Sequence, residues 1–135
     1  MFATNPGKQK GKFAFISKYK DLREILMDHK LAALGDAYVN FVYSLALSKR
    51  TGEPRGAKVD SHLLAEALKR ARLRNFLPRG TDRHKQADAV EALLVYVWTQ
   101  GLMTLEEGVD ALSQHEETVG AFCSLLLASK ERLHL

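Results

Sequence analysis

Three carboxylates stand inside apolar stretches, where acidic residues are unfavourable. Asp36 lies in LAALGDAYVNF, and Asp88 and Glu91 lie in ADAVEALLVYVW. A buried, unpaired carboxylate is costly enough that it normally takes up a proton or acquires a cationic partner. Asp88 and Glu91 are three positions apart, so on a helix they share one face. The sequence therefore indicates a cleft, a basic partner or a bound metal at this place.

If the two helices bearing these stretches cross in the core, Asp36 can join the Asp88–Glu91 pair. Three carboxylates form a hard oxygen site, which suits Mg²⁺, with Mn²⁺ as a substitute, better than zinc. Such an ion lowers the pKa of bound water and neutralises charge that develops on a phosphodiester. The opposing interpretation is structural and consists of these pairs: Asp36 with Asn40 or nearby backbone, Asp88 with His84 or Lys85, and Glu91 with an arginine of the preceding helix.

The charge of the chain is unevenly distributed. The net charge is +4, but residues 1–85 contain 18 Lys/Arg and eight Asp/Glu, whereas residues 86–135 contain two and eight. A basic surface suits a polyanion such as RNA, although basic residues that simply coat solvated helices give the same pattern. Two basic segments provide the candidate RNA-binding residues, which are Arg50, Arg55, Lys58, Arg79, Arg83, His84 and Lys85. Because His84 precedes Asp88 by four positions, we favour a hydrogen bond between them over metal ligation by His84.

The spacing of apolar residues predicts an all-α fold, with about six helices in one domain over residues 17–135 after a flexible basic segment over residues 1–16. A short FAFIS stretch is ambiguous and could be a strand. We expect Ser17 to cap the first helix and a central helix to run from about Lys30 to Lys49. A third helix should begin at Asp60 or Ser61, and a fourth should run from Thr81 or Asp82 to about Gln100, where Gly101 ends it. Capping boxes at Thr104–Glu107 and Ser113–Glu116 should begin the fifth and sixth helices.

Composition narrows the class of protein. Of the 135 residues, 46% are hydrophobic and 27% charged, as in ordinary globular proteins. The single cysteine, Cys123, cannot form an internal disulfide, which favours a reducing cytoplasm. No secretory signal is visible, and Asp36 and Glu91 interrupt the two most apolar stretches. We therefore expect a cytoplasmic protein that is not inserted in a membrane.

Two motifs resemble the catalytic domain of the ribonuclease III family. They are Leu34-Gly35-Asp36-Ala37 and Ala87-Asp88-Ala89-Val90-Glu91-Ala92-Leu93, in the family's order and separation. The resemblance implies an all-helical homodimer that cuts both strands of double-stranded RNA and leaves 5′-phosphate and 3′-hydroxyl ends. It also implies Mg²⁺ dependence, with Asp36, Asp88 and Glu91 holding metal or positioning water. The chain resembles most closely the minimal Mini-ribonuclease III branch, which lacks a double-stranded RNA-binding domain.

Three departures from the family pattern keep other functions open. Ala32 stands where the larger enzymes have a further glutamate, Val95 stands where glycine is frequent, and the basic arm over residues 79–85 follows no clear family pattern. One alternative is therefore an inactive RNA-binding or ribosome-associated module with the same fold. The other is a helical interaction protein whose buried acids are structural.

Overall fold

The computed structural model describes residues 13–135, so most of the segment 1–16 lies outside the described residues. The described part consists of helices and loops and contains no strand, which confirms the all-α prediction and assigns FAFIS to a turn. The elements are α1 (Leu22–Leu26), α2 (His29–Thr51), α3 (Ser61–Arg70), the 3₁₀ turn η2 (Arg74–Phe76), α4 (Arg83–Thr99), α5 (Leu105–Gln114) and α6 (Thr118–Arg132).

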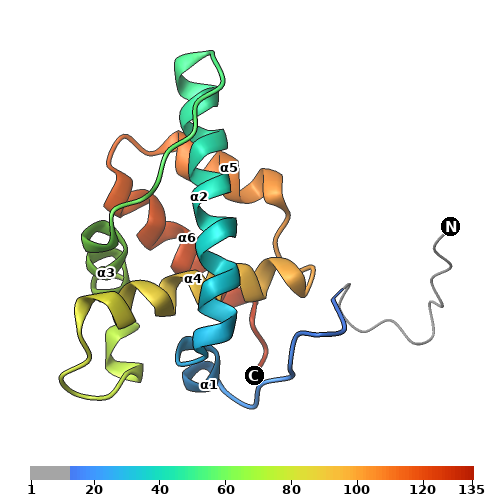
Figure 1. Ribbon diagram of the computed structural model, residues 1–135, viewed down its shortest axis with the longest axis vertical. Coiled ribbons are helices and arrows are strands. Elements are labelled where there is room, and N and C mark those ends of the chain that lie inside the picture. Colours follow the sequence, from blue (N-terminus) through green and yellow to red (C-terminus); the bar gives the residue numbers. More distant parts are fainter. Residues whose placement is uncertain (1–12) are drawn as a thin grey trace, which may run out of the picture.

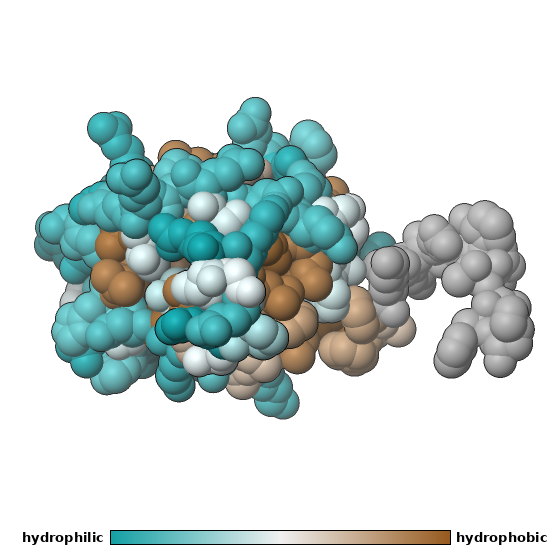
Figure 2. Space-filling model, turned by 90° about the horizontal axis from the view of Figure 1, so that it is seen from above, coloured by the Kyte–Doolittle hydropathy of each residue, from teal (hydrophilic) through white to brown (hydrophobic). Residues whose placement is uncertain are grey.

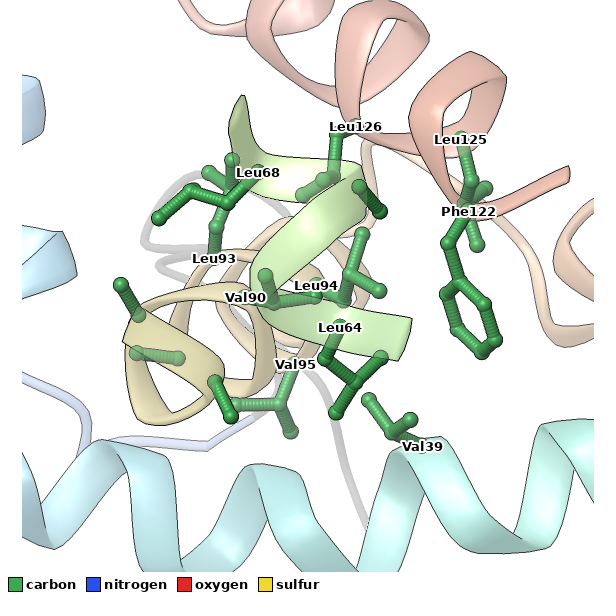
Figure 3. Close-up of a cluster of buried hydrophobic side chains, with 14 of the residues drawn as sticks. Val39, Leu64, Leu68, Val90, Leu93, Leu94, Val95, Phe122, Leu125 and Leu126 are labelled. Carbon is green, nitrogen blue, oxygen red and sulfur yellow. The ribbon is translucent and has the colours of Figure 1, made fainter. Parts of the chain in front are cut away.

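The core is built around α4, which is buried on almost every side between Ala87 and Val97. It packs most extensively against α2 and also contacts α1, α3 and α6. Figure 1 shows α4 crossing α2 at a steep angle. Figure 3 shows how the core joins the layers: Val39 of α2 lies near Leu64 of α3 and Val95 of α4, with Phe122 of α6 beside them. Burial of these side chains is the main stabilising contribution.

Gly35 allows α2 and α4 to approach each other closely. A Cβ atom at this position would stand 2.1 Å from the backbone oxygen of Glu91 and 2.4 Å from its carbonyl carbon. Only a residue without a side chain fits such a crossing, because neither backbone can move aside cheaply. The glycine therefore brings its neighbour, Asp36, directly to the helix that carries Glu91.

Most of the helix boundaries follow from local capping residues. Asp60 and Asp82 cap α3 and α4 as predicted, and Thr104 with Glu107 forms the expected capping box on α5. Two other predictions were wrong. Asp21 rather than Ser17 caps α1, and the Ser113–Glu116 box does not form, because α5 continues to Gln114 and α6 begins at Thr118.

A polar edge of α2 holds the segment that leads from α2 to α3. Asn40 Oδ1 accepts from the backbone nitrogen of Val59 (2.8 Å), and the hydroxyls of Ser44 and Ser48 accept from the backbone nitrogens of Ala57 (2.9 Å) and Arg55 (2.8 Å). Acceptors four positions apart on the helix thus meet every second residue of an extended chain. Figure 1 shows this green segment descending beside α2. It returns the chain to the vicinity of Asp36.

Several large apolar side chains stay exposed. Leu34 and Phe41 of α2 are 40% and 54% exposed, and Phe15 is 73% exposed. Figure 2 shows hydrophobic surface left open between hydrophilic residues. By length and composition alone, α2 could also span a membrane, a test that core helices of soluble proteins pass as well. Its contacts with α4 and α5 and its bonds to the segment 53–60 account for part of its composition.

Candidate active site

A cleft of about 540 Å³ opens where α2, α3, α4 and the segment before α3 meet. Asp36 enters it from α2, and Asp88 and Glu91 enter it from α4, as their spacing on one helix face requires. The three carboxylates predicted from the sequence therefore line one space. The residues lining the cleft are Asp36, Lys58, Val59, Asp60, Ser61, Leu64, His84, Ala87, Asp88 and Glu91.

Asp36 and Glu91 come into direct contact across the helix crossing. A hydrogen bond with Asp36 is one of the causes that raise the pKa of Glu91, and two carboxyls can form such a bond only when one of them carries a proton. Asn40 fixes the orientation of Asp36, because its Nδ2 donates to Asp36 Oδ1 (3.2 Å) and to the Asp36 backbone oxygen (2.8 Å). The same amide accepts from Val59, so Asn40 links Asp36 to the wall of the cleft.

The pKa of Glu91 rises strongly in this cleft. Glu91 is only 7% exposed. Burial, the hydrogen bond with Asp36 and the negative charges of Asp36 and Asp88 raise the pKa of Glu91 from 4.5 to about 8, with Lys58 opposing the increase. Such a shift arises where a carboxylate loses water and faces other carboxylates. Perturbed acids in a cleft are typical of functional sites.

Asp88 is half-buried beside this pair. Burial, together with the charge of Asp36, raises its pKa, and His29 and His84 act in the opposite direction. His84 lines the same cleft, as expected from its position four residues earlier on α4. In residues 13–135 no hydrogen bond joins His84 to Asp88, so their interaction is electrostatic.

The structural interpretation of the acids is supported only for Asp36, which does bond to Asn40. None of the salt bridges formed by the described residues includes any of the three carboxylates. Arg70 of α3 pairs with Glu66 and Glu117 instead of Glu91. Buried acids without an arginine or lysine partner favour a site that receives a cation from outside.

The donor set fits a hard divalent ion, but it is not preassembled. In the described part of the chain, no three His, Cys, Asp or Glu side chains lie close enough together to form a ready metal-binding group. The oxygen ligands of Asp36, Asp88 and Glu91 are those that Mg²⁺ and Mn²⁺ prefer, and repulsion among them raises the pKa of Glu91. A cation in the cleft would replace the proton of Glu91 and relieve that repulsion.

The seven basic residues proposed for RNA binding fall into separate places. Lys58 and His84 line the carboxylate cleft, and Arg79 and Lys85 line a neighbouring cavity. Arg83 lies between α3 and α4, where its Nη1 donates to His62 Nε2 (2.7 Å).

The other two lie elsewhere. Arg50 and Arg55 stand at the far end of α2, about 20 Å from Asp36 along the helix, given a rise of about 1.5 Å per residue. Arg50 donates to the His115 backbone oxygen (3.0 Å), and Arg55 pairs with Glu53. The structure therefore brings five of the seven to the region of the carboxylates.

Sequence reasoning missed the position of His29. It is the first residue of α2, it lines a cavity together with Asp88, and its charge opposes the rise in the pKa of Asp88. The signal was present, because Asp28 caps α2 by accepting from the Leu31 backbone nitrogen (3.0 Å). An Asp cap at that place predicts a helix that begins at His29.

Comparison with known families agrees with these observations. The model of the Ribonuclease III family matches residues 29–125, which include both acidic motifs and the helices that present them. No curated protein matches the chain. The match extends over well more than half of the 135 residues, and the described part is all-helical. The chain therefore belongs to the ribonuclease III family.

Proposed function

We propose that this protein is a metal-dependent endoribonuclease that hydrolyses phosphodiester bonds of double-stranded or structured RNA. Family membership supports an RNA-processing nuclease. The observation that carries the finer proposal is the contact between Asp36 and Glu91, two acids from different core helices in an open cleft with no basic partner in a salt bridge among the described residues. Such an arrangement lowers the stability of the fold, and destabilising arrangements of this kind are typical of sites that bind a ligand.

Asp36, Asp88 and Glu91 are the residues that would hold Mg²⁺, or Mn²⁺ in its place. When bound, the ion would supply stabilisation of charge on the scissile phosphate and a water acidic enough to attack near neutral pH. Asn40 keeps Asp36 oriented, since its amide is held by Val59 on the other side. Burial of Glu91 lowers the effective dielectric constant around its carboxyl, which strengthens charge interactions there.

Lys58 and His84 suit a second task at the rim of the same cleft. Both are exposed and basic, and neither side chain takes part in a salt bridge with another described residue. An RNA duplex offers phosphates and 2′-hydroxyls across a shallow groove, so it is gripped mainly by shape and charge. These two side chains would contact phosphates on either side of the carboxylates.

We also propose that the protein acts as a homodimer, as its family implies. The exposed side chains of Leu34 and Phe41 lie seven positions apart on α2, and Tyr38 and Leu45, half-buried, continue the same helix face. Phe15 adds a further open aromatic ring near the start of α2. An apolar stripe of this kind on a helix favours a second protein surface over water. A partner copy would bury it.

The test is cleavage of a long RNA duplex with Mg²⁺ or Mn²⁺ by the wild type and by Asp36→Asn, Asp88→Asn and Glu91→Gln. Each neutral variant keeps the shape of the side chain, so we expect folding to persist and cleavage to fall at least about a hundredfold. Asp110→Asn is the matched control, because this acid of α5 is half exposed and, among residues 13–135, forms a salt bridge only with the surface residue Lys49. Cleavage by the neutral variants at the wild-type rate would refute the site.

An inactive RNA-binding module is the second candidate. The carboxylates are not preassembled for a metal, and Ala32 is buried where the larger enzymes carry glutamate. A wild type that binds duplex RNA but cuts it with neither metal would favour this function. Products with 5′-phosphate ends would favour the first candidate, because metal-assisted hydrolysis by this family leaves such ends.

A further inference from the structure

A second cavity, of about 240 Å³, adjoins the carboxylate cleft at Asp88, which lines both. It lies between the end of α1, the first residue of α2, the segment 77–82 and the beginning of α4. Lys85 and Asp88 of α4 line it together with Asp82, the N-cap of that helix, at intervals of three positions, so one face of the beginning of α4 forms its wall. The two spaces therefore lie next to each other and share Asp88 as a wall residue.

The walls of this cavity are held in place before any ligand binds. Arg23 Nε of α1 donates to the Phe76 backbone oxygen (2.9 Å), which fastens η2 to α1. Gln86 Nε2 of α4 donates to the Thr81 backbone oxygen (2.7 Å), and the Thr81 hydroxyl donates to the Pro78 backbone oxygen. A preformed wall lowers the entropy that a ligand loses on binding.

The lining combines an apolar floor with a charged rim, in which Asp82 and Asp88 accompany three basic residues. The floor consists of Leu26, Met27, Leu77 and Pro78, and Met27 is 44% exposed. The rim carries the basic side chains of His29, Arg79 and Lys85. No salt bridge within residues 13–135 involves Arg79 or Lys85. The Asp82 carboxylate caps α4 by accepting from the Lys85 backbone nitrogen (2.9 Å), and the charge of Lys85 lowers the pKa of Asp82.

We propose that this cavity binds one ribose–phosphate unit of the RNA strand, next to the unit whose phosphate enters the carboxylate cleft. The inference rests on the proposed function. An anionic group meets Arg79 and Lys85, and the carbon skeleton of a sugar covers the apolar floor. A space of about 240 Å³ is smaller than a typical pocket for a drug-sized ligand, so it suits one backbone unit. In a duplex the bases are stacked and paired, which leaves ribose and phosphate for the protein.

The methionines offer a direct readout. The chain has three, of which Met27 lines this cavity and Met103 is buried in the core at 5% exposed. Methyl-labelled methionine gives few NMR signals, so Met27 reports on the cavity and Met103 serves as an internal reference. The titrants are ribose 5-phosphate, ribose and inorganic phosphate, each in metal-free buffer, followed by a short RNA duplex.

We expect ribose 5-phosphate and the duplex to shift the Met27 signal without moving Met103, and ribose alone to have no effect. Arg79→Gln and Lys85→Gln should each weaken the response at least about fivefold. Each should also lower the salt dependence of duplex binding by about one phosphate contact. Lys69→Gln is the control, since this exposed lysine in the last turn of α3 lines neither space.

Three results would overturn the inference: no shift at Met27 with ribose 5-phosphate or duplex, an equal response to free ribose, or an equal loss in Lys69→Gln. Because no metal is present, the titration does not depend on turnover. If the protein fails to cleave RNA but Met27 responds as expected, the proposed function falls and the subsite stands. If it cleaves RNA and Met27 does not respond, the subsite alone is refuted.

Discussion

Glu91→Gln should change how the stability of the metal-free protein depends on pH. In the folded protein the pKa of Glu91 rises from 4.5 to about 8, so folding favours the protonated form. Protonation of Glu91 therefore contributes fully to the stability of the fold below about pH 4.5, and this contribution is lost as the pH rises toward 8. Asp88, whose pKa is also raised, acts in the same direction.

The magnitude follows from the same shift. Each pH unit between the two pKa values costs about 1.4 kcal/mol, because the unfolded chain releases the Glu91 proton in this range while the folded protein retains it. The unfolding free energy therefore falls by about 3 kcal/mol by pH 7. For a chain of 135 residues this corresponds to about 10 °C in Tm. Glutamine keeps the shape of the side chain and an N–H group that can donate to Asp36, but it cannot ionise. The variant should therefore lose most of this pH dependence.

The assay is urea unfolding at several pH values between 5 and 8, with EDTA and then with Mg²⁺. Wild-type stability should fall steeply with pH in EDTA, and Mg²⁺ should restore more of it at pH 8 than at pH 5.5, because the ion competes with a proton. Glu116→Gln is the control, since this glutamate is exposed and forms no salt bridge with another described residue. Parallel pH profiles for the wild type and Glu91→Gln would refute the reasoning.

Three further changes test other parts of the structure. Gly35→Ala should destabilise the protein by about 3 kcal/mol or more, because the new Cβ would stand 2.1 Å from the Glu91 backbone oxygen. Gly108→Ala should be tolerated, because the nearest atom to its Cβ would be 3.4 Å away. Thermal unfolding of the two variants tests this difference. Asn40→Ala should cost about 1–3 kcal/mol and speed hydrogen exchange at the Val59 amide, and unchanged exchange there would contradict the role assigned to Asn40. Phe41→Glu should convert a dimer to a monomer in analytical ultracentrifugation, and a dimer that survives this change would show that α2 does not form the interface.

The meeting of the carboxylates could be predicted from the sequence, because it follows from the cost of burying charge and from the periodicity of a helix. Acids in apolar helices need a partner, and a spacing of three positions places Asp88 and Glu91 on one face. That Asp36 joins them depended on the two helices crossing, and the structure gives the reason for the close crossing, since Gly35 lies against the backbone of Glu91. Contacts set by one close helix crossing are accessible to this kind of reasoning.

What the sequence did not reveal depends on contacts between distant segments. Ser17 and Ser113 carry capping signals as good as those of Asp21 and Asp60, and only packing decides which of them begin helices. Arg50 lies in the basic last turn of α2, yet its side chain donates to the distant His115 backbone oxygen. No local pattern distinguishes such a structural arginine from one that is free to meet RNA.

The segment between α2 and α3 is an intermediate case. Asn40, Ser44 and Ser48 recur every four positions along an otherwise apolar helix, which is visible in the sequence. That they hold an extended chain, and through it bring Lys58 to the cleft, becomes clear only once the chain is seen to turn back along α2.

The most direct measurement of the central claim is anomalous diffraction from crystals of the protein soaked in Mn²⁺. If the three carboxylates form a divalent-ion site, an anomalous peak will lie within about 2.0–2.6 Å of oxygens from Asp36 on α2 and from Asp88 or Glu91 on α4, and it will vanish in Asp36→Asn. A fully soaked crystal with no peak between the two helices, or with the Asp36–Glu91 hydrogen bond intact beside Mn²⁺, would contradict it.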